Sequence, residues 1–215
     1  MSRLSFAFAL LPLVISAPAA ATVSIDPIGD FIPSFTGPQT GDLDVSGFSV
    51  AYDPGTEIFR IAGSLAAAIN PEADYYYVIG VNTGAGAIAP FGSIGEPNVV
   101  FDQVVVVGSE GEAFLGDESN ALAFTILGSD FTVDVPLSML PSTGRDPLEY
   151  AFNLWPRTDL DPPNLAAISD FAPDNSMIHP TSVPEPATWL MLLFGFGIAG
   201  TALRARRAEE IPSQV

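Results

Sequence analysis

Carboxylate and amide side chains crowd one Pro-rich stretch toward the end of the chain, and calcium prefers such oxygen ligands. The side chains are those of Asp159, Asp161, Asn164, Asp170, Asp174 and Asn175. Calcium takes about six to eight oxygens, but the spacing here does not match an EF-hand because the required glycine is missing. Two interpretations stay open: an acidic linker in solvent, which is the default, or a calcium site. The calcium site would use the four aspartates Asp159, Asp161, Asp170 and Asp174.

Catalytic chemistry has little support, because the sequence contains one histidine and no cysteine. Ser-His-Asp catalysis requires a histidine beside the nucleophile, and His179 precedes a proline in the same Pro-rich stretch. A zinc site is not expected, because the sequence lacks the cysteine and histidine ligands that zinc prefers. A P-loop is excluded because it requires a lysine, and the sequence has none. Paired carboxylates could hydrolyse a glycoside, but nothing selects a pair among the 25 acidic residues. We therefore expect no enzyme activity and no cofactor, with calcium as the open alternative and a secreted hydrolase as the least favoured function.

Aromatic side chains offer another way to hold a ligand. Tyr75, Tyr76 and Tyr77 are consecutive, and Trp155 lies in a later strand-like segment. Exposed rings could stack on sugars, although aromatic residues on half-buried strands usually serve packing. A calcium-assisted carbohydrate-binding module of the cell surface is therefore the alternative function, with exopolysaccharide as a candidate partner.

The C-terminal region has three parts in a fixed order: Pro184-Glu185-Pro186, the uncharged segment 187–203, and a cluster of arginines. As a helix, residues 187–203 would span about 26 Å, near the lower limit of about 17–25 residues for crossing a bilayer. Trp189 would lie at the interface. The arginines would stay in the cytoplasm by the positive-inside rule, so the preceding chain lies outside the inner membrane. These topology residues are Arg204, Arg206 and Arg207.

This arrangement resembles the PEP-CTERM sorting signal, and Trp189 matches the PEPxxWA variant of it. The resemblance implies that an exosortase of a Gram-negative bacterium recognises Pro184, Glu185, Pro186 and Trp189 and cleaves nearby. It also implies transient anchoring in the inner membrane, followed by release to the cell surface or the exopolysaccharide matrix. Two departures are Leu190, where the variant has alanine, and the tail 208–215 after the arginines.

The N-terminus has the features of a secretory signal peptide over residues 1–21. Arg3 supplies the positive charge, residues 4–15 are apolar, and Ala19 and Ala21 fit a signal-peptidase site. We therefore divide the chain into five parts. They are a signal peptide (1–21), an exported β-sandwich domain (22–158), a Pro/Asp-rich linker (159–183), the sorting signal (184–207) with its transmembrane helix (187–203), and a cytoplasmic tail (208–215).

The charge balance argues against anionic partners. The chain has a net charge of −18, with 25 acidic residues against 7 basic ones, all of them arginine. Such a surface repels phosphates, so we expect no nucleic-acid partner. The charge instead suits an acidic protein that stays soluble in a matrix.

The region between the two ends reads as a series of short strands. Turn residues separate apolar, β-branched and aromatic segments, as at Asp53-Pro54-Gly55-Thr56, where we expect a positive φ at Gly55. The alternation over residues 43–52 slips at Gly47, which predicts a bulge. The other predicted strands are 57–65, 75–82, 99–107, 112–115, 121–127, 131–135 and 148–155, with a long loop over 83–97. No stretch has a sustained helical period. We predict an all-β fold, an antiparallel β-sandwich of about eight or nine strands.

Overall fold

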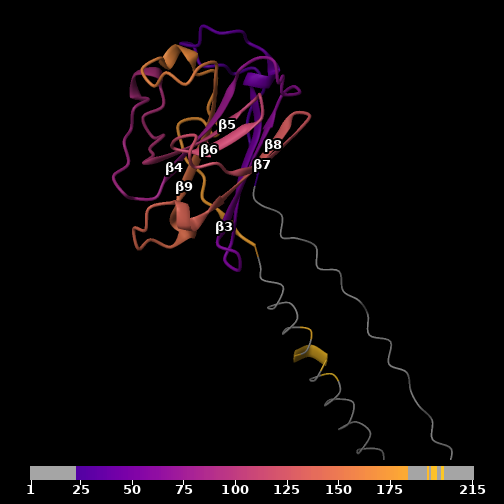
Figure 1. The fold of residues 1–215 in the computed structure, drawn as a ribbon. Helices are drawn as coiled ribbons and strands as arrows, with labels where there is room; N and C mark the ends of the chain where they lie inside the picture. Colours follow the sequence, from indigo (N-terminus) through magenta and orange to yellow (C-terminus); the bar gives the residue numbers. More distant parts are fainter. Residues whose placement is uncertain (1–22, 184–192, 194, 198–199, 201–215) are drawn as a thin grey trace, which may run out of the picture. The chain divides into compact units, whose positions relative to one another are not determined.

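The computed structural model describes residues 23–183, 193, 195–197 and 200 (Figure 1). Residues Ala20–Val183 form one compact unit that is distinct from the terminal segments. The signal peptide with Ala19 and Ala21, the tripeptide 184–186, Trp189, the three C-terminal arginines and the tail 208–215 lie outside the described residues. The described positions within 187–203 are helical. Among the described residues, no helix is long and apolar enough to cross a membrane.

Two sheets form the domain. The larger sheet has the order β1-β2-β3-β8-β7 and is antiparallel, and β10 adds one parallel pairing to β2. Its strands are β1 (Ser24–Ile25), β2 (Val45–Asp53), β3 (Ile58–Leu65), β7 (Ala123–Leu127), β8 (Asp130–Pro136) and β10 (Thr181–Ser182). The smaller sheet is antiparallel with the order β6-β5-β4-β9. Its strands are β4 (Tyr76–Asn82), β5 (Gln103–Gly108), β6 (Glu112–Leu115) and β9 (Ala151–Arg157).

An inner core joins the facing surfaces of the two sheets. Alternate residues of β3 and β8 pack against alternate residues of β4 and β9, as the two-residue period of a strand requires. The rings of Tyr77 and Phe131 lie 5.3 Å apart between centroids, and those of Phe59 and Phe152 lie 5.4 Å apart. These contacts make the domain a β-sandwich.

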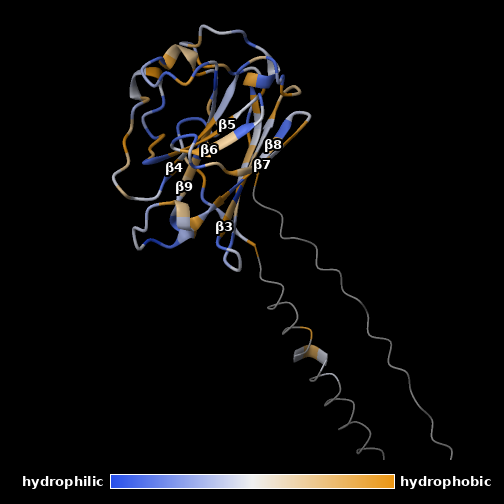
Figure 2. Ribbon diagram, in the orientation of Figure 1, coloured by the Kyte–Doolittle hydropathy of each residue, from blue (hydrophilic) through white to orange (hydrophobic). Residues whose placement is uncertain are grey.

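A second core covers the outer face of the smaller sheet. Val78, Val106 and Trp155 on that face are buried by loop residues such as Phe91 and Phe171. The smaller sheet is therefore buried on both sides. This explains why the sequences of its strands are nearly continuous runs of apolar residues. Hydrophobic residues accordingly occur in the connections as well as in the strands (Figure 2).

The predicted all-β class and the antiparallel sheets are confirmed. The bulge predicted at Gly47 is present, because the register of β2 with β3 shifts between Val45 and Gly47. The turn after β2 forms as expected, with the Asp53 carboxylate accepting hydrogen bonds from the Gly55 backbone and the Thr56 hydroxyl, both at 2.9 Å. The positive φ expected at Gly55 was wrong, because Glu57 adopts it instead, with φ of 55°.

The described part of the chain contains five short 3₁₀ turns that the sequence did not predict. They are η1 (Gly41–Leu43), η2 (Gly92–Ile94), η3 (Leu137–Met139), η4 (Pro147–Glu149) and η5 (Leu165–Ala167). Two of them shorten predicted strands. The turn η1 occupies the start of the strand predicted over 43–52, so β2 begins at Val45. The turn η4 occupies the start of the strand predicted over 148–155, so β9 begins at Ala151.

The structure corrects the domain boundary, because the predicted linker 159–183 is part of the folded domain. Ile168, Ala172 and Ile178 form bridges with β9 along its free edge, and the segment then reaches β2 of the other sheet as β10. Ile168, Phe171 and Ala172 are fully buried. A Pro/Asp-rich composition suggested a solvated linker, yet three apolar side chains spaced through it are enough to hold the segment on the sheet edge.

Candidate functional site

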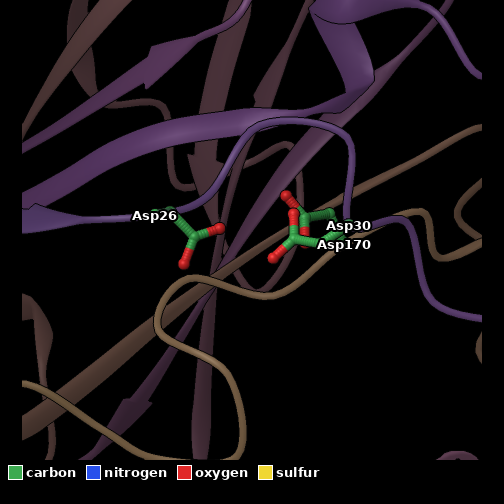
Figure 3. Close-up of side chains that lie close together, drawn as sticks. All are labelled: Asp26, Asp30 and Asp170. Carbon is green, nitrogen blue, oxygen red and sulfur yellow. The ribbon is translucent and has the colours of Figure 1, made fainter.

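Three aspartates from distant parts of the chain meet at one end of the sandwich. Asp26 follows β1, Asp30 ends the adjacent turn, and Asp170 lies between η5 and the segment that bridges to β9. One carboxylate oxygen from each residue lies within 4.8 Å of the others. Figure 3 shows Asp26 on one side of the group, with Asp30 and Asp170 beside each other on the opposite side.

Backbone amides hold Asp170 in position. Its two carboxylate oxygens accept hydrogen bonds from the amides of Val45 and Phe171, each at 2.8 Å. The neighbouring Ser169 hydroxyl donates to the Leu43 carbonyl at 2.7 Å, which fixes this segment against the start of β2. The side chain of Asp170 is completely buried, so its orientation is set by the fold.

The turn that carries Asp26 and Asp30 is fixed by another carboxylate. The Gly29 amide donates to the Asp44 carboxylate at 2.9 Å, and Asp44 is itself buried. Asp26 is 5% exposed. One buried oxygen on each of Asp26, Asp30 and Asp44 has no hydrogen-bond partner. The fold therefore brings several carboxylates together without satisfying all of their acceptors.

The electrostatics of the cluster disfavour negative charge. Burial raises the pKa of Asp26 to about 7, and three nearby aspartates contribute, namely Asp30, Asp174 and Asp44. Burial likewise raises the pKa of Asp170 to about 8, with Asp26 and Asp30 contributing and the backbone hydrogen bonds acting in the opposite direction. A positive partner among these carboxylates would therefore stabilise the folded protein.

The arrangement suits ion binding better than catalysis. Buried carboxylates at this spacing are hard oxygen ligands of the kind that bind calcium. A glycosidase also uses two carboxylates, but a sugar ring must fit between them. Asp170 is fully buried and Asp26 is 5% exposed, so two of the three carboxylates offer a sugar ring little accessible surface.

The structure divides the calcium ligands that the sequence suggested. Asp170 belongs to the buried cluster, and Asp174 lies close enough for its charge to act on Asp26. Asp159 and Asp161 instead surround Arg157. The Arg157 guanidinium donates to the Asp161 carbonyl at 2.6 Å and lies 3.5 Å from the Asp159 carboxylate.

Asn164 and Asn175 are also separated from each other. The Asn164 side chain donates to Asp159 at 2.7 Å, within the Arg157 group. The Asn175 side-chain oxygen accepts a hydrogen bond from the Asn98 backbone amide at 2.9 Å, and the Asn175 backbone amide donates to the Glu96 carboxylate. The predicted four-aspartate site is therefore replaced by two groups with different partners.

Sequence reasoning missed Asp26, Asp30, Asp44 and the role of Arg157. The segment that contains Asp26 and Asp30 has no periodic pattern, so nothing local placed it beside Asp170. One available signal was Ile168-Ser169-Asp170-Phe171-Ala172, where a single acid stands among residues that favour burial. A buried acid requires a partner, and that requirement could have prompted a search for one.

The aromatic and histidine candidates have structural roles. Tyr77 and Trp155 are buried and cannot stack on a sugar. The Tyr76 hydroxyl donates to Asp74 at 2.5 Å, and Tyr75 and Tyr76 pack partly against the outer core. Nδ1 of the exposed His179 lies 2.9 Å from the Tyr150 carbonyl. His179 also lines a shallow surface hollow with Arg145, Leu148 and Glu149.

The C-terminal end of the domain passes directly into the predicted sorting signal. Thr181 and Ser182 pair with Ala51 and Tyr52, and the Val183 amide donates to the Tyr52 carbonyl at 2.9 Å. The next residue is Pro184. The described domain therefore ends one residue before the Pro-Glu-Pro tripeptide, with no intervening linker.

Comparison with protein families identifies a PEP-CTERM protein-sorting motif at residues 182–207. The resemblance noted at Pro184-Glu185-Pro186 is thereby confirmed, and the motif begins on the last residue of β10. The chain is a β-sandwich protein with a C-terminal PEP-CTERM sorting signal. Such a signal supports export, anchoring before processing, and an exosortase as the processing partner. No curated protein and no solved structure matches the chain.

Proposed function

We propose that the protein is a non-catalytic component of the cell envelope or exopolysaccharide matrix of a Gram-negative bacterium. It is exported by its N-terminal signal peptide and held in the inner membrane by residues 187–203. An exosortase then cleaves it near Pro184-Glu185-Pro186 and passes the β-sandwich domain to the cell surface or the matrix.

The observation that carries this proposal is the sorting motif at 182–207, which follows a folded domain without a gap. Prolines at 184 and 186 lack amide hydrogens and restrict φ, so the tripeptide resists joining a helix. An extended segment is the conformation that a protease can bind as a strand. Moving the arginines that follow the apolar segment into the bilayer costs free energy. They therefore keep the helix from sliding and hold the tripeptide at a fixed distance from the membrane surface.

A non-catalytic role agrees with the described side chains. The one histidine contacts a backbone carbonyl at the surface, and two of the three carboxylates in the group of Asp26, Asp30 and Asp170 are buried. The high negative charge favours solubility in a hydrated polymer matrix and disfavours nucleic acid. Carbohydrate binding through Tyr77 or Trp155 receives no support because both rings are buried.

The test replaces Pro184, Glu185 and Pro186 with alanine in a chain tagged at both ends. The expected result is an uncut, full-length protein retained in the inner membrane, because a continuous helix would hide the cleavage segment. The measurement is a fractionation blot in cells with and without the exosortase.

A matched control replaces Glu210, Ile211 and Pro212 with alanine, because this triplet also contains a glutamate and a proline but lies beyond the motif. The control variant should be processed like the wild type. Equal processing of the wild type and the 184–186 variant would show that the tripeptide is not the recognition element. The segment would then be a plain membrane anchor.

A further inference from the structure

We propose that Asp26, Asp30 and Asp170 form a binding site for one hard divalent cation, calcium in particular. Their carboxylate oxygens converge within 4.8 Å, a separation that one ion can bridge. The site is independent of the sorting function, and it differs from the four-aspartate site that the sequence suggested.

Unpartnered buried oxygens point to a ligand at this position. Asp26 is 5% exposed, and its Oδ2 has no hydrogen-bond partner. Asp30 Oδ1 and Asp44 Oδ1 are also buried without partners. Buried polar atoms in folded proteins are nearly always paired, and a buried carboxylate without a partner is especially costly. A cation bound by Asp26, Asp30 and Asp170 would give the Asp26 and Asp30 carboxylates a positive partner.

The charges around the cluster also indicate a bound cation. Further acids lie close enough for their charges to act on this group, namely Asp44 and Asp174. The ion pairs of the described domain are Arg60 with Asp134 and Arg157 with Asp159, so neither arginine neutralises the cluster. Arg145, the remaining arginine of the described domain, lies beside Gly84 and lines the hollow that contains His179. The cluster thus gathers carboxylates with no arginine paired to them among the described residues, and a divalent ion would supply the balancing charge.

The ligand chemistry favours calcium over other metals. Zinc prefers histidine and cysteine, whereas this group offers only carboxylates. Magnesium demands near-ideal octahedral geometry and keeps several waters. Calcium accepts irregular sets of about six to eight oxygens from loops, and these aspartates lie in loops and turns. Extracellular calcium modules bind with Kd of about 0.1–1 mM, and we expect an affinity in this range.

Bound calcium would fasten the N-terminal segment to the segment after β9. Asp26 and Asp30 precede the first long strand, whereas Asp170 follows the last long one. Asp170 already accepts from the Val45 amide, across 125 positions of sequence. An ion at this point adds a second link between the same distant segments, so binding should raise the thermal stability of the whole domain.

The test measures calcium binding and thermal unfolding of the full-length chain, purified in mild detergent after removal of metal with EDTA. At about 10 mM calcium, roughly 100 times a Kd of 0.1 mM, the Tm should rise by about 5 °C or more. Calorimetric titration with calcium chloride should give one site per chain. Magnesium at the same concentration should shift the Tm less.

The principal variant is Asp26→Asn, which keeps the size of the side chain and removes its charge. Without calcium its Tm should equal or exceed that of the wild type, because repulsion among the carboxylates falls. With calcium the wild type should become the more stable protein, since the variant has lost a ligand. This crossover separates loss of binding from a folding defect, which would lower the Tm under both conditions.

The matched control is Asp161→Asn, the same change at the position that the sequence had suggested for calcium. This variant should bind calcium like the wild type, because the hydrogen bonds of Asp161 in the Arg157 group are made by its backbone carbonyl and its backbone amide, which the change keeps. Asp30→Asn, at a half-buried position in the turn, should weaken binding as Asp26→Asn does.

Two outcomes would overturn the proposal. Calcium binding that survives Asp26→Asn and Asp30→Asn but disappears in Asp161→Asn would place the ion at residues 159–164. A wild type that neither binds calcium nor gains stability from it, while Asp26→Asn raises its Tm, would show that protons alone relieve the cluster.

Discussion

Trp155 illustrates how its surroundings determine the role of one residue. Its ring lies 5.0 to 5.1 Å, between centroids, from Phe101 and Phe91 on the outer face of the smaller sheet. Gly80 on the adjacent strand leaves room for that ring, because a Cβ there would lie 2.6 Å from Trp155 Cζ3. Trp155, whose ring could stack on a sugar if it were exposed, therefore lies at the centre of the second core.

Replacing Gly80 with alanine should destabilise the domain by about 1–3 kcal/mol, the usual cost of overpacking a filled core. Urea unfolding of the exported domain measures the effect. Gly92→Ala is the control, because the nearest atom to its added Cβ would be 3.9 Å away and its φ is ordinary. Equal stability of the two variants would show that the Trp155 ring is not held against Gly80.

At the scale of elements, the segment 159–183 completes both sheets of the sandwich. It covers the free edge of β9 through Ile168, Ala172 and Ile178, and it ends as a strand on β2. An uncovered edge would expose unpaired backbone groups of a strand that is buried along its whole length. The segment is thus a structural element that happens to have the composition of a linker.

We therefore expect a chain ending at Val183 to fold and a chain ending at Thr158 to fail. The shorter chain loses Ile168, Phe171 and Ala172, which are all fully buried. Their loss should lower the free energy of unfolding by more than the whole stability of a domain of this size. Near-ultraviolet circular dichroism and resistance to proteolysis compare the two chains. Equal folding of both would restore the linker interpretation of residues 159–183.

At the scale of the whole molecule, a predicted signal peptide and a PEP-CTERM sorting motif flank a strongly acidic domain. The predicted signal peptide and the positive-inside rule, applied to the C-terminal arginines, would each place the domain on the outer side of the inner membrane. The domain achieves its compact form without disulfides, because the chain has no cysteine. Packing on both faces of the smaller sheet takes their place, with the proposed ion as a further link.

Processing at the N-terminus gives a direct test of this organisation. The mature protein should begin at Thr22, because Ala19 and Ala21 provide the small residues that signal peptidase requires. Mass spectrometry of protein recovered from the cell surface identifies the terminus. Peptides that contain Arg3 in this material would mean that the segment is not removed.

The features that the sequence alone determined are the local ones. The strands of the smaller sheet were predictable because β-branched and aromatic residues favour extended backbone over a few consecutive positions. The bulge at Gly47 was predictable because a glycine interrupts a two-residue period. The sorting signal was recognisable because its tripeptide, apolar segment and arginines are contiguous.

The tertiary structure alone decided which distant residues meet. Asp170 was grouped with Asp159 and Asp161 because they are neighbours in sequence, whereas the fold turns Asp170 toward Asp26 and leaves the others with Arg157. The reason is that loop carboxylates have no periodicity to indicate their direction. Their positions follow from how the sheets pack and from which apolar residues anchor the loops, as Ile168 and Phe171 do beside Asp170.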